Sequence, residues 1–380
     1  MQENRGITGA GQDGGAGNPS RMRGMTEFTP IVHVDGGRAW RGGQQQMLLL
    51  AAELRRRGCA QWIVARDPAI AERLRAAGCE AHSFRHPPPI PSGAVVHAHD
   101  GRALSWVLWR GAWRRGRATL VASRRVAFPP RRLTIWKYRR ARRVLAVSGF
   151  IRRQLLAAGL EPERVETVPD GIDLETLPAA APARARIRAA LQLPESTPVA
   201  ATLAAFTPEK NLPCLLEALA RGPGDLHVLL AGEGPGLAEL RRRARELRLE
   251  SRLHVRADYP ALAAMPLAAW VAAADFYVLP SRQEGLGSSL LVAMAYALPL
   301  MAARVGGIPE LVEDGRNGVL LDPDDAPAWA AALTRLAAEP ERARALGARG
   351  RRRVAEFTAA RLAERTLAAY AAARAAAAPR

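Results

Sequence analysis

The sequence predicts an α/β protein made of two doubly wound domains in series. Its 380 residues exceed what a single hydrophobic core usually serves. From residue 31 onward, short β-branched or apolar runs alternate with longer amphipathic runs, which is the pattern of a parallel sheet covered by helices. An Ala/Pro/Arg-rich stretch at 178–198 interrupts this pattern before it starts again. We interpret that stretch as the segment between the two domains.

The first domain is placed at residues 28–175. Strands are expected at IVHVD (31–35), QWIVAR (61–66), AVVHAHD (94–100), TLVAS (119–123) and RVLAVS (143–148). Amphipathic helices are expected at 44–58, where Gly58 ends the helix, and at 69–78.

The second domain is placed at residues 176–355. Strands are expected at 199–206, 226–232, 253–257, 276–281, 298–303 and 318–322, with helices at 211–222, 236–249 and 288–298 between them. A long alanine-rich helix at 356–380 could cross back to the first domain. Ligands of such sheets bind outside the carboxyl ends of the strands, so we expect the site in a central cleft that both domains face.

Three further features bear on location. Residues 1–27 are glycine-rich and lack an apolar core, which predicts a disordered tail rather than a secretory signal. Residues 261–280 have the length of a transmembrane helix, but Pro266 and Asp275 favour a short helix, a turn and a buried strand. Cys59, Cys79 and Cys214 lie far apart without CxxC spacing, so we expect free thiols in a reducing cytoplasm.

The segment PSRQEGLGSS, residues 280–289, is the first candidate for chemistry. A predicted strand ends at Pro280, and a turn with Gly285 and Gly287 leads to a helix that Ser288 opens. Free backbone N–H groups at such a turn can bind phosphate, although an ordinary capped turn has the same spacing. A carboxylate such as Glu284 repels a nearby phosphate, so we expect Glu284 to accept hydrogen bonds from a neutral group of the ligand, such as sugar hydroxyls.

Two other turns carry weaker signals. FTPEKN, residues 206–211, places Lys210 after a strand and at a helix start, where it could neutralise a diphosphate or simply be solvated. RGGQQQ, residues 41–46, places Gly42 and Gly43 before the first helix, but it lacks the full GxGxxG spacing.

These segments, with the runs GEGPGLAEL (232–240) and AMAYALPLMAARVGGIPELVEDGRNGVLLDPDD (293–325), are similar to the C-terminal half of family 4 retaining glycosyltransferases. RRVLAVSGFIRRQLLAAGLEPERVETVPDGID (142–173) resembles the end of their N-terminal half. The resemblance covers about residues 30–365. It implies the GT-B fold, in which two Rossmann-like domains face a central cleft.

The resemblance also implies transfer of a sugar from a nucleotide-sugar to a cell-envelope glycolipid or polysaccharide precursor, with retention of configuration. The nucleotide-sugar is then a co-substrate, and neither a cofactor nor a metal is expected. Glu284 would bind the donor sugar, Lys210 would stabilise the leaving diphosphate, and fixed donors in a closed cleft would stabilise the developing charge. The donor-binding amides are expected at Gly42, Gly43, Gly285, Leu286 and Gly287.

The chain departs from the family pattern at three positions. The usual second glutamate, which commonly holds the ribose, falls at Val292, and an arginine often paired with the lysine falls at Ala205. A first-domain histidine is replaced by Arg125, which we place among the catalytic residues. Loss of one charged hydrogen bond costs about 1.5–3 kcal/mol, so donor binding is expected to weaken by tens of times. A degenerate binding or scaffold subunit is the alternative.

Two motifs could suggest metal. DPDD, residues 322–325, has the spacing of a metal-binding DxD motif, but an aspartate that caps the following helix explains it better. HAHD, residues 97–100, puts His97 and His99 on one side of a strand, yet no third ligand is evident. We assign His99 and Asp100 to the acceptor side and expect no metal.

The basic charge is concentrated in the first domain. Residues 101–160 hold 16 of the 55 basic side chains and no acid, within a formal net charge of +19. Trp106, Trp109 and Trp113 recur at helical spacing beside arginines, as in helices that lie on membranes, although they could equally pack on the sheet. We expect an anionic membrane surface as a partner, at the inner face of the cytoplasmic membrane, rather than nucleic acid, whose binding motifs are missing.

Overall fold

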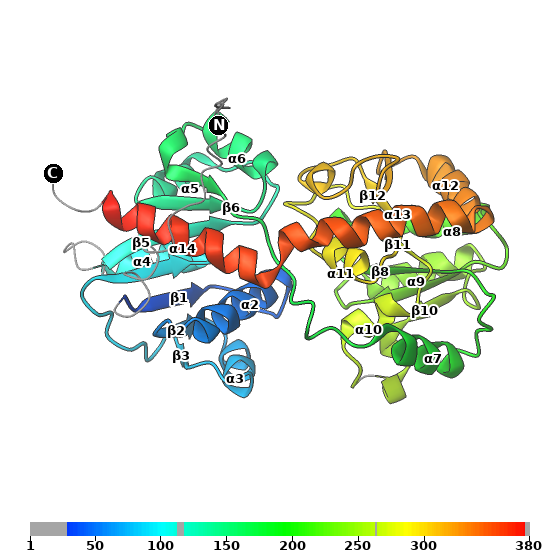
Figure 1. Cartoon of the computed structure of the whole chain (residues 1–380), viewed down its shortest axis with the longest axis horizontal. Coiled ribbons are helices and arrows are strands. Elements are labelled where there is room, and N and C mark those ends of the chain that lie inside the picture. Colours follow the sequence, from blue (N-terminus) through cyan, green and yellow to red (C-terminus); the bar gives the residue numbers. More distant parts are fainter. Residues whose placement is uncertain (1–28, 112–117, 263, 377–380) are drawn as a thin grey trace, which may run out of the picture.

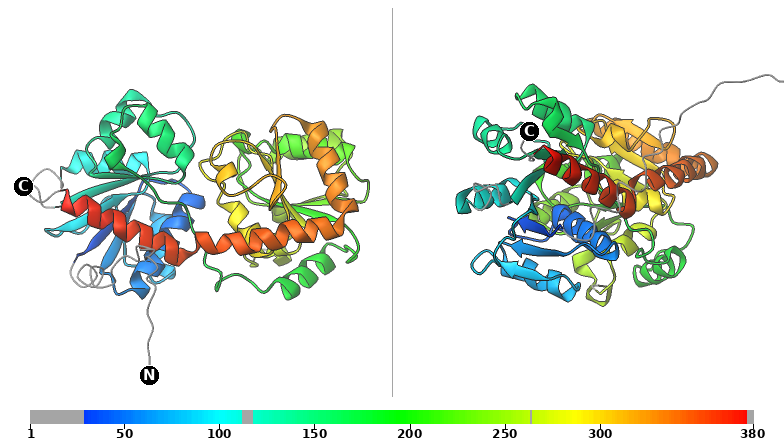
Figure 2. Two further views of the ribbon diagram at one scale, coloured as in Figure 1. Left: turned by 45° about the horizontal axis from the view of Figure 1, so that its top comes forward. Right: turned by 60° about the vertical axis from the view of Figure 1, so that its left-hand side comes forward.

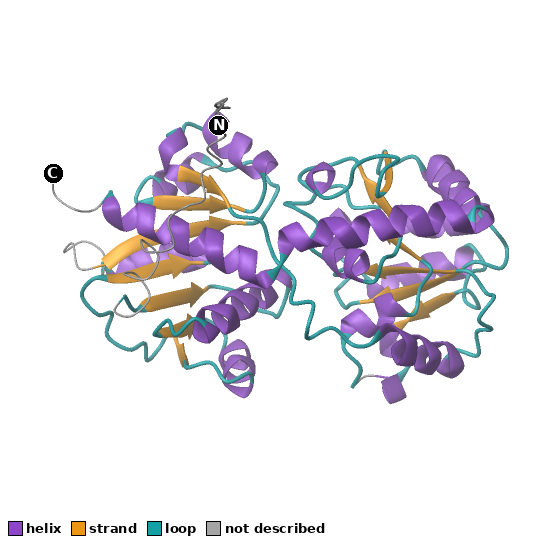
Figure 3. Cartoon of the chain, in the orientation of Figure 1, coloured by secondary structure: helices purple, strands orange, loops and turns teal. Residues whose placement is uncertain are grey.

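The computed structural model describes residues 29–111, 118–262 and 264–376 and contains two parallel sheets side by side (Figure 1). The first sheet has the strand order β3-β2-β1-β4-β5-β6-β7, and the second has the order β10-β9-β8-β11-β12-β13. Helices cover both faces of each sheet (Figure 3). This confirms the predicted pair of doubly wound domains. The predicted tail at 1–27 lies outside the described residues.

The first domain follows the predicted alternation with two added strands. Its strands are β1 (Ile31–Asp35), β2 (Gln61–Ala65), β3 (Ala81–Ser83), β4 (Ala94–Ala98), β5 (Ala118–Arg124), β6 (Arg143–Ala146) and β7 (Val165–Thr167). Its helices are α2 (Gly42–Arg56), α3 (Pro68–Ala76), α4 (Gly101–Arg110), α5 (Arg132–Tyr138) and α6 (Gly149–Ala157), with a 3-10 turn η1 (Pro162–Arg164). The added strands β3 and β7 have three residues each and only one buried residue each, so they leave little pattern in the sequence.

The second domain contains one helix where a connecting segment was expected. Its strands are β8 (Val199–Leu203), β9 (His227–Ala231), β10 (Leu253–Val255), β11 (Phe276–Leu279), β12 (Leu300–Ala303) and β13 (Gly318–Leu321). Its helices are α7 (Ala180–Ala190), α8 (Leu212–Arg221), α9 (Leu237–Glu246), α10 (Leu267–Ala272), α11 (Ser289–Ala295), α12 (Ala326–Ala338) and α13 (Pro340–Arg353). The 3-10 turns are η2 (Pro208–Lys210), η3 (Arg256–Asp258), η4 (Pro260–Leu262), η5 (Ile308–Glu310) and η6 (Val354–Phe357).

Helix α7 corrects the interpretation of residues 178–198 as only an interdomain segment. It packs against α10 of the second domain. Arg188 is buried in this contact and donates to the Ala273 carbonyl and, at 2.8 Å, to the Asp275 carboxylate. These bonds satisfy a guanidinium that would otherwise be costly to bury.

The last helix, α14 (Ala359–Ala375), lies on the first domain rather than on the second (Figures 1 and 2). Leu362 and Tyr370 of α14 share a hydrophobic cluster with Ile31, Leu50 and Val95. The chain therefore passes between the domains twice. The two passages lie side by side, because Ile172 and Thr358 form a parallel bridge.

The apolar stretch 261–280 divides into η4, α10 and β11, as its proline and aspartate predict. Among the residues that the structure describes, no helix is both long enough and apolar enough to cross a membrane. Cys59, Cys79 and Cys214 are free.

Candidate functional site

The second sheet changes direction of winding between β8 and β11, where the loops after two neighbouring strands diverge. Lys210 lies in the loop after β8 and Glu284 in the loop after β11. Lys210 Nζ donates to Glu284 Oε1 at 2.6 Å, and Ser281 Oγ donates to the same oxygen at 2.8 Å. The structure thus joins the two predicted charged residues at the place where ligands of such sheets bind.

The glycine turn after Glu284 contacts the first domain. A Cβ atom on Gly285 would lie 2.0 Å from the Arg125 carbonyl oxygen, so only glycine allows this approach. The Ser148 hydroxyl donates to the Gly285 carbonyl at 2.6 Å. Gly287 has φ of +88°, a left-handed conformation that favours glycine, and the Leu286 side chain is buried. The turn that follows Glu284 therefore also contributes to the contact between the two domains.

Arg125 lies in the loop after β5 and contacts Asp170 and His99. Its Nε donates to Asp170 Oδ1 at 3.1 Å, and its Nη1 lies 3.4 Å from His99 Nδ1. Asp170 also accepts a hydrogen bond from Ser288, at the start of α11 in the second domain. Asp170 was not singled out from the sequence. Its position just after β7, at the carboxyl edge of the sheet, is the signal that could have identified it.

A chain of buried imidazoles leads to Arg125 from the interior. The Gln61 amide nitrogen donates to the Ala51 carbonyl at 2.6 Å, so Gln61 Oε1 is the acceptor that faces His33 Nε2 at 3.0 Å. His33 must then carry its proton on Nε2, because neutral imidazole has one N–H. Its bare Nδ1 accepts from His99 Nε2 at 2.9 Å. His99 Nδ1 is consequently bare and faces the Arg125 guanidinium.

The environment keeps these rings uncharged. Burial lowers the pKa of His33 to about 4, and burial together with neighbouring histidines and Arg125 lowers the pKa of His99 well below its ordinary value. Burial also lowers the pKa of His97 well below its ordinary value. His97 bonds the Tyr370 hydroxyl at 2.8 Å and thereby ties β4 to α14.

The expectation that His97 and His99 have no third companion is wrong. His33 supplies it, and ring nitrogens of the three residues lie within 4.8 Å of one another, a spacing that could hold a metal. The ring nitrogens already take part in hydrogen bonds, and a guanidinium stands beside His99. A divalent cation would have to displace these bonds and tolerate Arg125. The chemistry of the group therefore fits a hydrogen-bonded chain better than a metal centre.

The other first-domain residues are distributed along the same edge. Asp100 caps α4 through the Arg102 and Ala103 N–H groups, and its other oxygen accepts from Gly36 N at 2.6 Å. Gly42 and Gly43 start α2, and a Cβ atom at either would meet nothing within 4 Å. The space beside these two glycines is open, whereas both oxygens of Asp100 are engaged.

The departures from the family pattern have ordinary environments. Val292 is partly buried on α11 and packs against the hydrophobic core. Ala205 is partly exposed in the loop that leads to Lys210. In DPDD, Asp325 accepts from Ala328 N and caps α12, while Asp324 pairs with Arg282. Helix capping therefore explains this motif, as expected.

Glu310 makes a further interdomain contact that was not expected from the sequence. The Glu310 carboxylate, after β12 in the second domain, accepts from Gly149 N at 2.8 Å and Phe150 N at 2.7 Å in the first domain. These are free N–H groups at the start of α6, where a carboxylate is favourable. Glu310 and Asp170 therefore each bridge the two domains.

Comparison with known proteins identifies the family. A profile described as "Glycosyl transferases group 1" matches residues 183–353, and one described as "Glycosyltransferase Family 4" matches residues 94–176. The chain is similar to the family 4 glycosyltransferases in both of its domains. Together the two matches reach into both domains, and the glycosyltransferase family resemblance predicted from the sequence is confirmed.

Curated relatives of this chain include the alpha-maltose-1-phosphate synthase of Mycolicibacterium smegmatis, 35% identical over 60% of this chain and 62% of the relative. The D-inositol 3-phosphate glycosyltransferase of Kineococcus radiotolerans is 36% identical over 60% of this chain and 57% of the relative. The alignments thus span about three fifths of the length of these curated relatives.

Solved structures show the same fold. HepE of Anabaena, in complex with UDP and glucose, superposes with a TM-score of 0.79 at 19% identity, covering 90% of this chain and 100% of that chain. Sucrose-phosphate synthase of Thermosynechococcus elongatus gives 0.74 at 23% identity, covering 92% and 100%. The chain therefore has the GT-B fold.

Proposed function

We propose that this family 4 protein transfers a sugar from a nucleoside diphosphate donor to an acceptor, with retention of anomeric configuration. The Lys210–Glu284 pair is the observation that carries the proposal, because it places one cation and one acceptor of sugar hydroxyls where β8 and β11 diverge. The relatives support a nucleotide-sugar donor. HepE was solved with UDP-glucose, and one curated relative is named for its dependence on GDP-mannose.

Each residue has a chemical task in this proposal. A donor diphosphate competes with Glu284 for the Lys210 ammonium, which then stabilises the charge of the leaving group. Glu284, released from Lys210, accepts hydrogen bonds from the sugar. The amides of the 285–287 turn and of Gly42 and Gly43 approach the donor from opposite domains. Retention follows when the acceptor attacks from the face that the diphosphate leaves.

The acceptor is proposed to bind on the first-domain side, near His99, Asp100 and Arg125. The chain of neutral imidazoles presents the bare Nδ1 of His99 toward Arg125 and thereby holds the guanidinium at the edge that faces Gly285. Arg125 adds positive charge close to the leaving group. No metal takes part in this proposal, since Lys210 and Arg125 supply the cations.

We further propose that the acceptor is a cell-envelope glycolipid or polysaccharide precursor, reached at an anionic membrane surface from the cytoplasmic side. Helices α4 and α5 and the loop before α5 expose five large apolar side chains: Trp109 at 83%, Leu133 at 61%, Phe128 at 53%, Val126 at 50% and Trp136 at 49%. Exposed arginines accompany them, namely Arg102, Arg110, Arg131 and Arg132. Such a surface suits a lipid interface. Trp106 instead stacks on Phe84, and Trp113 lies outside the described residues.

Nucleotide release from a panel of UDP-sugars and GDP-mannose, with membrane extract as acceptor, tests the proposed transfer. Release that requires both Glu284 and extract supports it. Binding of a nucleotide-sugar without release by any donor supports the alternative, a degenerate scaffold. Analysis of the product's anomeric configuration by NMR tests retention separately.

Co-sedimentation with anionic vesicles tests the membrane surface. The double variant Trp109→Ala/Leu133→Ala should bind these vesicles several times more weakly than the parent protein. Leu267→Ala, which removes a side chain 39% exposed on the second domain, is the matched control. Equal sedimentation with neutral and anionic vesicles contradicts the membrane proposal.

A further inference from the structure

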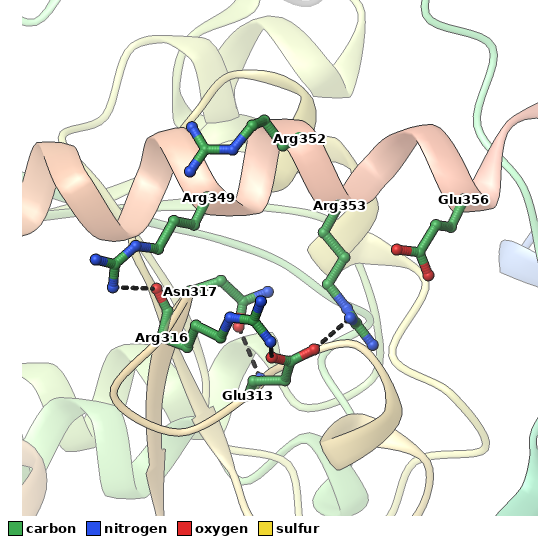
Figure 4. Close-up of a pocket in the computed structure, with 7 residues that line it drawn as sticks. All are labelled: Glu313, Arg316, Asn317, Arg349, Arg352, Arg353 and Glu356. Atoms are coloured by element: carbon green, nitrogen blue, oxygen red, sulfur yellow. Dashed lines mark hydrogen bonds and ion pairs between the residues drawn. The ribbon is translucent and has the colours of Figure 1, made fainter.

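A cavity of about 280 Å³ lies in the second domain between α13 and the loop that joins η5 to β13 (Figure 4). Its charged lining consists of Arg316, Arg349, Arg352, Arg353, Glu313 and Glu356. None of these residues belongs to the proposed transfer site at Lys210 and Glu284.

The positive charge of this arginine-lined cavity is only partly compensated. Glu313 pairs with Arg316 at 2.6 Å and also with Arg353. Arg349 and Arg352 form no ion pair with any residue that the structure describes, although Arg349 donates to the Arg316 carbonyl at 3.3 Å. Arg349, Arg352 and Arg353 are spaced i, i+3, i+4 on one helix, where like charges repel. An anion between them relieves that repulsion.

We propose that the arginine-lined cavity binds a phosphate-bearing small molecule. Guanidinium groups match the geometry of phosphate oxygens and remain charged at all relevant pH values. Figure 4 shows Arg349 and Arg353 extending from α13 toward the loop that carries Glu313 and Arg316, so groups from two elements converge on one space. Four arginines outweigh Glu313 and Glu356, and the volume accommodates a phosphate ester or a diphosphate.

The cavity is connected to the interdomain contact. Arg353 Nη2 donates to the Glu310 carbonyl at 2.9 Å, while the Glu310 carboxylate binds the first turn of α6 in the other domain. A bound phosphate competes with Glu313 for Arg316 and Arg353. It therefore contacts groups beside the interdomain bridge made by Glu310, and the cavity is separate from the proposed transfer site.

Isothermal titration with inorganic diphosphate at low salt tests the proposal, in a Lys210→Ala background that weakens diphosphate binding at the proposed transfer site. This variant should still bind one diphosphate per chain. Adding Arg349→Ala and Arg352→Ala should weaken that binding by at least about tenfold, because two charge-assisted contacts are lost. Neither arginine is in an ion pair within the described structure, so these variants should keep the parent melting temperature.

The matched control is Arg342→Ala/Arg344→Ala, which removes two exposed arginines of α13 that pair with Glu339 and Glu341 outside the cavity. It should leave diphosphate affinity within about twofold of its background. Absence of binding in Lys210→Ala alone overturns the proposal, as does equal binding with and without Arg349 and Arg352. Neither result bears on sugar transfer, which is measured in the parent protein.

Discussion

The two sheets change winding direction at equivalent places, yet the residues there differ in kind. Between β1 and β4 the first domain has buried, neutral imidazoles, His33 and His99, that end at one cation, Arg125. Between β8 and β11 the second domain has an ion pair, Lys210 with Glu284, whose lysine side chain is 22% exposed. The same topology thus places neutral imidazoles, hydrogen-bonded to one another, at this point in the first domain. In the second domain it places an ion pair whose partners can be exchanged for ligand groups.

This difference assigns the two halves different work. The hydrogen bonds of His33 and His99 fix the orientation of these two rings. The rings therefore position Arg125 rather than bind a charged ligand. The ion pair can exchange either partner for a ligand group of the same charge. Under the proposed function, a charged donor would bind to the second domain, and the first domain would supply a positioned Arg125.

The largest expected effect comes from removing the acid of the exchangeable pair. Glu284→Ala should lower turnover by about a hundredfold or more, which corresponds to about 3 kcal/mol of lost transition-state stabilisation. The melting temperature should change little, because Lys210 can turn to solvent. Steady-state kinetics and differential scanning fluorimetry check both statements.

Arg282→Ala is the control for Glu284→Ala. Arg282 lies two residues before Glu284, and its removal breaks an exposed ion pair with Asp324. It should retain nearly full turnover. If Glu284→Ala and Arg282→Ala lose activity equally, the loop is merely structural and the special role of the ion pair is refuted.

Acidification should destabilise the first domain, because it favours protonation of the buried neutral His33. The folded pKa of His33, about 4, lies below the ordinary value of 6.5, so the fold resists protonation. The contribution of His33 to stability is complete above pH 6.5 and is lost as the pH falls toward 4. At pH 5 the loss is about 2 kcal/mol for this residue. Melting temperature against pH measures it, and histidine NMR titration assigns it.

Selectively labelled histidine separates His33 from the second-domain pair His227 and His254, whose pKa values burial also lowers. A His33→Asn variant identifies the resonance. A His33 signal that titrates near 6.5 contradicts the neutral chain.

Interrupting the chain without adding charge should affect catalysis more moderately. His33→Phe removes the acceptor that holds His99 Nε2–H, so His99 and then Arg125 lose their fixed orientation. We expect a loss of about ten- to thirtyfold in kcat/KM. His82→Phe, in the same domain and paired with Glu80, is the control and should be near parent activity. Activity of His33→Phe equal to the control shows that Arg125 needs no positioning.

The smallest expected effect is a gain. Val292→Glu supplies the carboxylate that the family resemblance implies for the ribose, and should tighten nucleotide binding by about tenfold. Calorimetry with the best donor nucleotide measures this, with Val292→Leu as the apolar control that should leave affinity unchanged. Unaltered binding in both variants means that residue 292 does not reach the nucleotide.

Much of the fold was readable because most of its longer strands are largely buried runs rich in apolar residues. IVHVD coincides with β1, whose five residues are all buried. Helix α7 was not foreseen, since alanines and Pro182 resemble a connection. Pro182 is the third residue of the helix, in the first turn, where a missing N–H costs nothing.

The site was partly readable because Glu284 and Lys210 follow strands directly. His33 could not be joined to His97 from the sequence, because their pairing depends on β1 lying beside β4 in register, His33 opposite His97. Asp170 and Glu310 were missed for a related reason. Glu310 binds α6 of the first domain, and Asp170 binds Ser288 of the second domain as well as Arg125 of its own. No local pattern records how two domains meet.

Helix α14 has a consequence for biosynthesis. A ribosome makes the first sheet early. The surface that Leu362 and Tyr370 cover nevertheless stays exposed to solvent until α14 emerges from the exit tunnel. The second domain has all its strands before then. Nascent chains should therefore gain a protease-resistant second domain first, and the amino-terminal half should mature only once α14 has emerged.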